Sequence, residues 1–203
     1  MQTKKTLTLL SAFAAVSLLV ACAEVPQQEV DAAKADIEAA KTAEAETYAT
    51  AEFQAASDSL NAANAEIETQ NAKFVLFRNY DRASVLLKSA SAGAKQSGTL
   101  AAENKQKVMA EVAQLKTDTQ TALTTANELL AKAPKGKESK EALEAIKNDL
   151  MSVEAGITEA DGMTANNQWL PARDRLKAGL DKTNQIIQEL NDAIAKKQGL
   201  SRG

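Results

Sequence analysis

The stretch SASAGAKQSGTL, residues 89–100, decides the fold because it lies in the middle of a segment, residues 80–133, that no proline interrupts. Its two glycines and its small hydroxyl residues weaken a helix interior. The following residues keep a heptad seam that includes Val108, Leu115 and Leu129. We therefore expect one long helix, continuous or kinked at this stretch, rather than two separate helices. A helix of that length spans about 80 Å.

Helical periodicity continues on both sides of this segment. Apolar residues recur every three or four positions from residue 27 onward, in segments 27–48 and 51–77 before the long helix. Two further helices follow the linker at residues 133–139, with a polar turn at residues 165–168 between them. An amphipathic hairpin must bury its apolar stripe against another element. The sequence therefore predicts an elongated all-α fold of helical hairpins, arranged as two three-helix bundles in series that share the central helix.

The expected domain boundaries follow from this arrangement. Residues 27–98 form an alanine-rich helical module, and residues 99–203 form the second bundle. Residues 50–90 align with residues 140–179 when one loop residue is deleted, so that Tyr80 matches Trp169. Duplication explains this alignment, but any two amphipathic hairpins also align when their stripes are phased together. In either case both segments are hairpins of similar length.

The N-terminus carries the pattern of a secretory signal. Two lysines precede a short apolar run that ends in Leu19-Val20-Ala21-Cys22, and this run is too short to be a stable membrane span. The ending resembles the lipobox of bacterial lipoproteins. That resemblance implies removal of residues 1–21, a diacylglycerol thioether on Cys22 and a lipidated tether at residues 22–26. The alternative is an ordinary signal peptide with a cysteine near its cleavage site.

The residue after the cysteine indicates in which membrane the anchor is expected to lie. It is Ala23 rather than the aspartate that marks inner-membrane retention in enterobacterial lipoproteins. The resemblance therefore implies an anchor in the outer membrane, on its periplasmic face. Two or more acyl chains make such an anchor durable.

Composition excludes several functional classes. The chain has no histidine and one cysteine, which excludes Ser-His and Cys-His nucleophilic sites and His/Cys zinc sites. Its 24 basic and 27 acidic residues are interleaved, so no basic patch for nucleic acid is expected. The acids lie largely between stripe positions, as on a solvated helix face, whereas a glycosidase needs two acids that face each other across a cleft. We expect a non-catalytic protein without cofactor, metal or nucleic acid.

Two stretches of the first module carry a family resemblance. They are AAKADIEAAKTAEAETYATAEFQAASDSLNAANAEIE, residues 32–68, and NYDRASVLLKSASAGA, residues 79–94. Over residues 27–98 the chain resembles the bacterial lipoprotein family known by the domain of unknown function numbered 4398. The matching positions are Tyr48, Ala49, Phe53, Ala56, Leu60, Ala63, Tyr80, Ala83, Leu86, Ala90 and Ala94.

The resemblance implies an envelope lipoprotein with a helical module, and it implies no reaction. Thr50 departs from the family pattern, because relatives commonly have proline there. Relatives often carry a peptidoglycan-binding domain of the outer-membrane-protein-A type after this module. Residues 99–203 show no strand alternation, so wall binding is not carried over to this chain.

Two places are candidate binding sites. In AKFVLFRNY, residues 72–80, the side chains of Phe74, Phe77 and Tyr80 either form an exposed patch that docks a partner or a membrane, or close the hairpin core. Because Phe74 continues the stripe from Ile67, we expect Phe74 and Phe77 to cap the core and Tyr80 to pack beneath the turn. Trp169, beside ANNQ, either stacks on a glycan ring or closes the other hairpin, and we expect closure.

These observations predict a lipid-anchored periplasmic rod with a structural or adaptor role. Its partner would be an envelope protein, bound through helix-groove or coiled-coil contacts. The alternative is a binding module for an apolar or glycan ligand between helices. Exposure of Val108, Leu115 and Leu129 would indicate a missing partner helix, and a closed cavity lined by leucine and isoleucine would favour the ligand.

Overall fold

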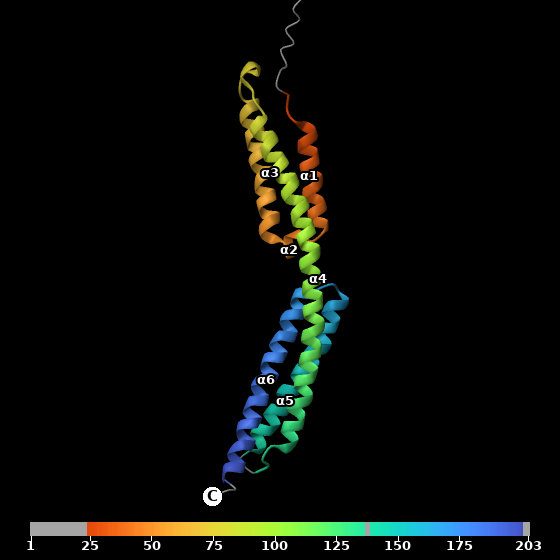
Figure 1. Ribbon diagram of the computed structural model, residues 1–203, viewed down its shortest axis with the longest axis vertical. Helices are drawn as coiled ribbons and strands as arrows, with labels where there is room; N and C mark the ends of the chain where they lie inside the picture. Colours follow the sequence, from red (N-terminus) through yellow and green to blue (C-terminus); the bar gives the residue numbers. More distant parts are fainter. Residues whose placement is uncertain (1–23, 137–138, 201–203) are drawn as a thin grey trace, which may run out of the picture.

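The protein is all-α in the part that its computed structural model describes, residues 24–136 and 139–200 (Figure 1). These residues form no strand, which confirms the predicted fold class. They form seven helical elements: α1 (Gln27–Thr42), α2 (Ala45–Tyr48), α3 (Thr50–Asn71), the 3₁₀ helix η1 (Val75–Phe77), α4 (Asp81–Lys132), α5 (Lys140–Ala165) and α6 (Trp169–Leu200).

Helix α4 is continuous through residues 89–100 and contains 52 residues. Small hydroxyl side chains do not interrupt it, and two of them bond to carbonyls of their own helix. Ser97 donates to the carbonyl of Ala94 at 2.9 Å, and Thr99 donates to the carbonyl of Lys95 at 3.1 Å. The helix runs almost the whole length of an elongated body, which we call the rod (Figure 1). Its own length is about 78 Å.

In the first half of the rod, α1 and α3 both pack against the N-terminal half of α4, and α2 connects them near the middle (Figure 1). The core here is mostly alanine, with larger side chains such as Val30, Ile67 and Leu87 toward the outer end. Alanine allows helices to approach closely, but each one buries little apolar area. This core is therefore thin, as its composition predicts.

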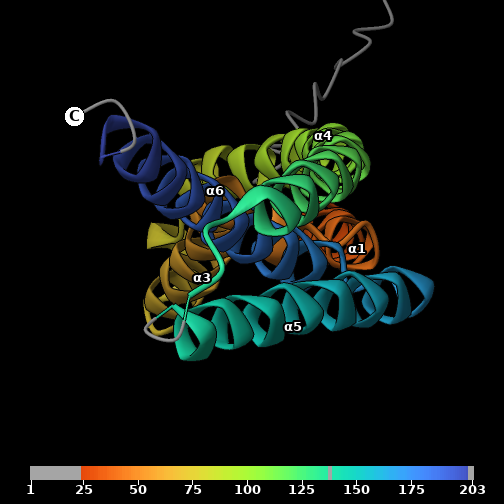
Figure 2. The same cartoon turned by 90° about the horizontal axis from the view of Figure 1, so that it is seen from below.

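In the second half, α6 packs along the C-terminal half of α4, and α5 packs mainly against α6. Viewed along the rod, α6 lies between α4 and α5 (Figure 2). The core contains larger residues than the first half, including Leu123, Leu150, Leu176, Ile186 and Leu190. Contacts between α4 and α5 are sparse, so α6 carries most of the packing here.

The two cores meet at Tyr48, near the middle of the rod, which packs against both of them. Its backbone carbonyl accepts a hydrogen bond from the Asn104 amide at 2.8 Å. The ammonium of Lys105 pairs with the carboxylate of Glu44 and lies 5.9 Å from the centre of the Tyr48 ring. Burial, followed by the negative charge of Glu44, raises the pKa of the Tyr48 phenol.

Two predicted helix boundaries were wrong. Segment 27–48 is not one helix, because Glu44 takes a left-handed conformation with φ 61° and separates α1 from α2. Segment 51–77 ends earlier than predicted, since α3 stops at Asn71.

Matching positions of the two aligned hairpins have the same structural role. Tyr80 immediately precedes α4 and Trp169 begins α6. In each hairpin the alanine and the leucine that follow the aromatic residue are buried, Ala83 with Leu87 and Ala172 with Leu176. The shared pattern after each turn therefore corresponds to a shared packing environment.

Candidate functional site

The main exposed apolar feature is the apolar tip, residues 74–77, which links α3 to α4 at one end of the rod (Figure 1). Four consecutive side chains face solvent: Phe74 at 66%, Val75 at 38%, Leu76 at 63% and Phe77 at 74% exposure. The rings of Phe74 and Phe77 lie 6.2 Å apart between centroids and are tilted by 52°. They form one aromatic pair on the outside of the molecule.

This arrangement overturns the expectation that Phe74 and Phe77 cap the hairpin core. Phe74 lies beyond the end of α3 in extended backbone, so it does not continue the stripe from Ile67. Tyr80, in contrast, packs beneath the turn as expected and is only 6% exposed. Its hydroxyl donates to Oδ1 of Asn71 at 2.6 Å.

A polar base holds the tip in place. The Arg78 guanidinium donates from Nε to the carbonyl of Lys73 at 3.0 Å and from Nη2 to the carbonyl of Asn71 at 2.9 Å. These bonds satisfy carbonyls that the end of α3 leaves without a helical partner. Buried Gln70 accepts the backbone N–H of Asn79 and the Lys73 ammonium, each at 3.0 Å. The loop is therefore tied to α3 from both of its sides.

The beginning of α4 is fixed by the same loop. Asn79 Oδ1 accepts the backbone N–H of Asp81 at 2.8 Å, which gives a hydrogen-bond acceptor to an N–H group in the first turn of α4.

Sequence reasoning missed several of these residues. The residues of this base, and Val75 and Leu76 in the tip, were not among the predicted site residues. One sequence signal marks them: FVLF has four apolar residues in succession, which no single helix stripe accommodates.

The loop that carries the tip is basic, and acids lie just beyond both of its ends. Lys73 and Arg78 flank it, and residues 69–80 contain no acid, although the whole chain has a formal net charge of −3. Glu68 and Asp81 lie just outside this range, so the basic character is limited to the loop itself.

The N-terminal end of the described chain lies beside this base. Val25 packs against the same core cluster as Tyr80 and Leu87. Glu29, in the first turn of α1, bonds to the hydroxyl of Ser84 and lies 3.4 Å from the Lys88 ammonium. The start of α1 and the apolar tip therefore lie at the same end of the rod (Figure 1). Cys22 lies outside the described residues.

Trp169 is a packing residue in this structure. Its ring lies against the core cluster that contains Val108, Ala172 and Leu176. Its indole N–H is buried and has no hydrogen-bond partner among the described residues. The side chain packs at the start of α6 and closes this end of the α5–α6 hairpin, as the sequence predicts.

The heptad seam of α4 is covered within the chain. Val108 is buried, and Leu115 and Leu129 pack against the cores that α5 and α6 complete. The exposure that would indicate a missing partner helix is not found at these residues.

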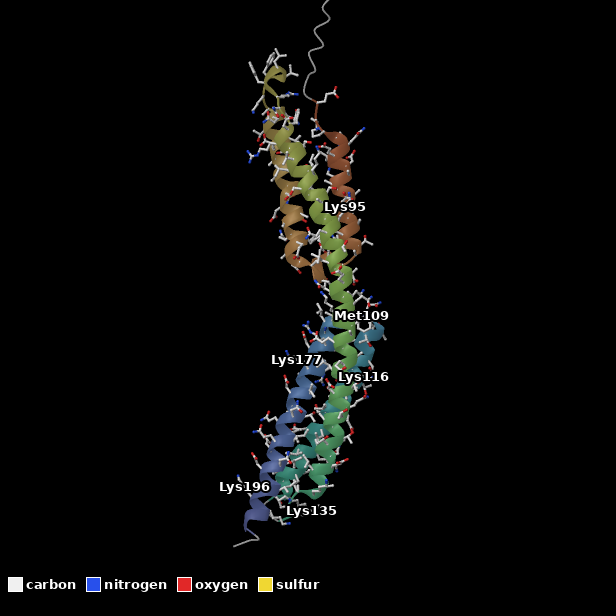
Figure 3. The ribbon with its side chains drawn as sticks, viewed as in Figure 1. Lys95, Met109, Lys116, Lys135, Lys177 and Lys196 are labelled. Carbon is white, nitrogen blue, oxygen red and sulfur yellow. The ribbon has the colours of Figure 1, made fainter. Side chains whose placement is uncertain are left out.

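A groove lies at the other end of the rod, between the end of α4 and the start of α5. Its volume is about 760 Å³, and its lining includes the apolar side chains of Leu130 and Leu143 and the cationic side chains of Lys135, Lys140 and Lys147. It is an open surface groove, not the closed cavity of leucine and isoleucine that would favour a buried ligand. Figure 3 shows Lys135 and Lys196 at this end.

No group of three or more His, Cys, Asp or Glu side chains within residues 24–136 and 139–200 is arranged to hold a metal ion. None of the helices in these ranges is both long enough and apolar enough to cross a membrane.

Comparison with family models, with curated proteins and with solved structures gave no match to this chain.

Proposed function

We propose that this protein is a lipid-anchored, non-catalytic rod of the bacterial envelope, held on the periplasmic face of the outer membrane through Cys22, with a structural or adaptor role. The anchor rests on the lipobox resemblance at residues 19–22. The structural observation that carries the role is the position of the N-terminal end: α1 begins at one end of an elongated body (Figure 1). A lipid on Cys22 would therefore hold the rod by its end.

The distance between the two ends supports an adaptor. Because α4 is continuous over about 78 Å, it would carry the far end well away from the lipid surface. Anchoring also confines the protein to the surface, which raises its effective concentration toward any partner within reach. The role needs no reaction, only a defined separation between the anchor and a partner.

The far groove is the surface that we assign to an envelope partner. It combines the apolar side chains of Leu130 and Leu143 with three lysines and one acid, Glu144, which pairs with Lys147. The remaining positive charge suits an acidic amphipathic segment. The same lining favours a second candidate function, the binding of a small anionic amphiphile, whose apolar part would lie on the leucines. Both candidates place binding at the end opposite the anchor.

The anchor is tested by expressing the full chain in a bacterium with an outer membrane, beside a Cys22→Ser control. We expect the wild-type chain in the outer-membrane fraction, with an intact mass that includes acyl chains on a mature chain beginning at Cys22. The control should be free of acyl mass and should leave the membrane fraction. An unacylated wild-type chain, or a control that stays equally membrane-bound, would contradict the proposal.

A further inference from the structure

We infer that the apolar tip inserts into the same lipid leaflet that holds the Cys22 anchor, so that the rod is attached at two points and stands away from the membrane. This inference rests on the proposed lipid anchor and adds a second lipid-binding element to it. The occupant of the tip is thus a phospholipid surface, not a protein groove.

The first argument is the chemistry of the tip. Phe74, Leu76 and Phe77 project from a tight turn and are each more than half exposed. Phenylalanine and leucine are the side chains that interfacial segments bury at the boundary between headgroups and acyl chains. An apolar projection of this kind has no internal packing role, since the core beneath it is closed by Tyr80.

The second argument is the charge behind the tip. Lys73 and Arg78 lie immediately on either side of the four apolar residues and are the charged residues nearest to them in sequence, whereas the acids Glu68 and Asp81 lie further back, at the ends of α3 and α4. When the apolar side chains reach about 5–10 Å into the lipid, cations at the base of the tip lie at headgroup level. Basic groups in that position are attracted by anionic lipids.

The third argument is rigidity. Gln70, Arg78 and Tyr80 bond the loop to α3 and to its C-terminal carbonyls. The apolar side chains are therefore held outward before any lipid is present, and insertion does not have to order the loop. Such preorganisation favours binding because less conformational entropy is lost.

The fourth argument selects lipid as the occupant. Val25 packs against the core cluster that contains Tyr80, the residue beneath the turn of the tip. Cys22 is three residues earlier, and three residues of extended chain reach at most about 11 Å. Acyl chains on Cys22 would therefore enter the bilayer close to the base of the tip, and they would bring the tip to the same surface.

The test places an indole in the tip. We would make Phe77→Trp together with Trp169→Phe, so that the new indole is the only one in the chain. The acylated protein is reconstituted in vesicles of phosphatidylethanolamine and phosphatidylglycerol with brominated acyl chains. We expect the emission from position 77 to lose most of its intensity and to shift to shorter wavelength, relative to vesicles without bromine. Circular dichroism checks that the double variant keeps its helix content.

The matched control is the wild-type protein, whose single indole is Trp169, the first residue of α6. Helix α6 begins near the middle of the rod (Figure 1). Its emission should be the same in both kinds of vesicle. Quenching at position 77 that is no stronger than at Trp169 would overturn the inference. A tip that docks on a protein instead of lipid would give this same result. The intact mass of the same sample reports acylation of Cys22, so failure of the anchor is distinguished from failure of the tip.

A second measurement tests the tip without the anchor. In the Cys22→Ser chain, the further changes Phe74→Ser and Phe77→Ser remove two exposed rings, so the fold should be unchanged by circular dichroism. Vesicle affinity should fall by about a hundredfold, since two rings are removed and each contributes about tenfold or more when it is buried. Equal affinity with and without the two rings would refute insertion of the tip.

Discussion

Replacing Gly98 by alanine should stabilise the protein, whereas the same change at Gly93 should not. Both glycines lie in the interior of α4. Alanine is favoured over glycine in a helix interior by about 0.8–1.0 kcal/mol. The surroundings of the added methyl group decide whether this gain is kept.

The two sites differ in how closely another helix approaches. At Gly98 an added Cβ would lie 3.6 Å from Cα of Ala40 and 3.8 Å from Cβ of Ala43, which are ordinary contacts. At Gly93 it would lie 3.1 Å from Cβ of Ala56, a buried residue of α3. Overpacking of this kind costs about 1–3 kcal/mol. We therefore expect Gly98→Ala to gain about 1 kcal/mol and Gly93→Ala to lie between neutral and about 2 kcal/mol destabilising.

Urea titration followed by circular dichroism measures both effects on the free energy of unfolding. For a chain of this size, a gain of about 1 kcal/mol raises Tm by about 2–4 °C. Gly162→Ala is the matched control, because nothing lies within 4 Å of its added Cβ and it reports helix propensity alone. Equal gains at Gly98 and Gly93 would refute the close approach of α3 to α4, and a loss at Gly98 would refute a continuous helix at residues 89–100.

Three further changes test the core, the base of the tip and the surface charge. Leu87→Ala removes a fully buried side chain and should lower the free energy of unfolding by about 2–5 kcal/mol, measured by the same titration. Tyr80→Phe removes the hydroxyl that donates to Asn71 and should cost about 1 kcal/mol in that assay; an unchanged value would show that this bond does not hold the loop. The hydroxyl of Ser91 lowers the pKa of Asp36 below its ordinary value of 3.8, so the ionised carboxylate stabilises the fold above that pH, and this contribution is lost as the pH falls through the lowered pKa. Asp36→Asn should therefore be less stable than wild type at neutral pH, with a difference that shrinks in acid, and a difference that grows in acid would contradict this sign.

The long helix could be predicted because its signals are local. No proline occurs between residues 80 and 133, and the apolar seam from Val108 onward keeps its phase. The break between α1 and α2 could not be predicted in the same way. Glu44 is neither glycine nor asparagine, yet it takes a left-handed conformation, and its carboxylate pairs with Lys105, which is 61 residues away along the chain. A contact that distant leaves no trace in the local pattern.

The apolar tip was misplaced for a related reason. A stripe that reaches Ile67 predicts a buried residue seven positions later, which is Phe74. The helix ends before that position, and Arg78 turns back and donates to the carbonyl of Asn71 at this end. Periodicity describes which face of a helix is buried, but it does not report where a side chain from the next loop satisfies the helix end.

Continuity of α4 matters for the proposed function because the side-chain packing at the middle of the rod is too small to keep the rod straight by itself. The first core is built largely from alanine, and it meets the second core around Tyr48. Small side chains bury little area, so contacts here resist bending weakly. The backbone hydrogen bonds of α4 run unbroken past this point. A rod fixed at one end by lipid would thus owe the position of its far groove mainly to the stiffness of a single helix.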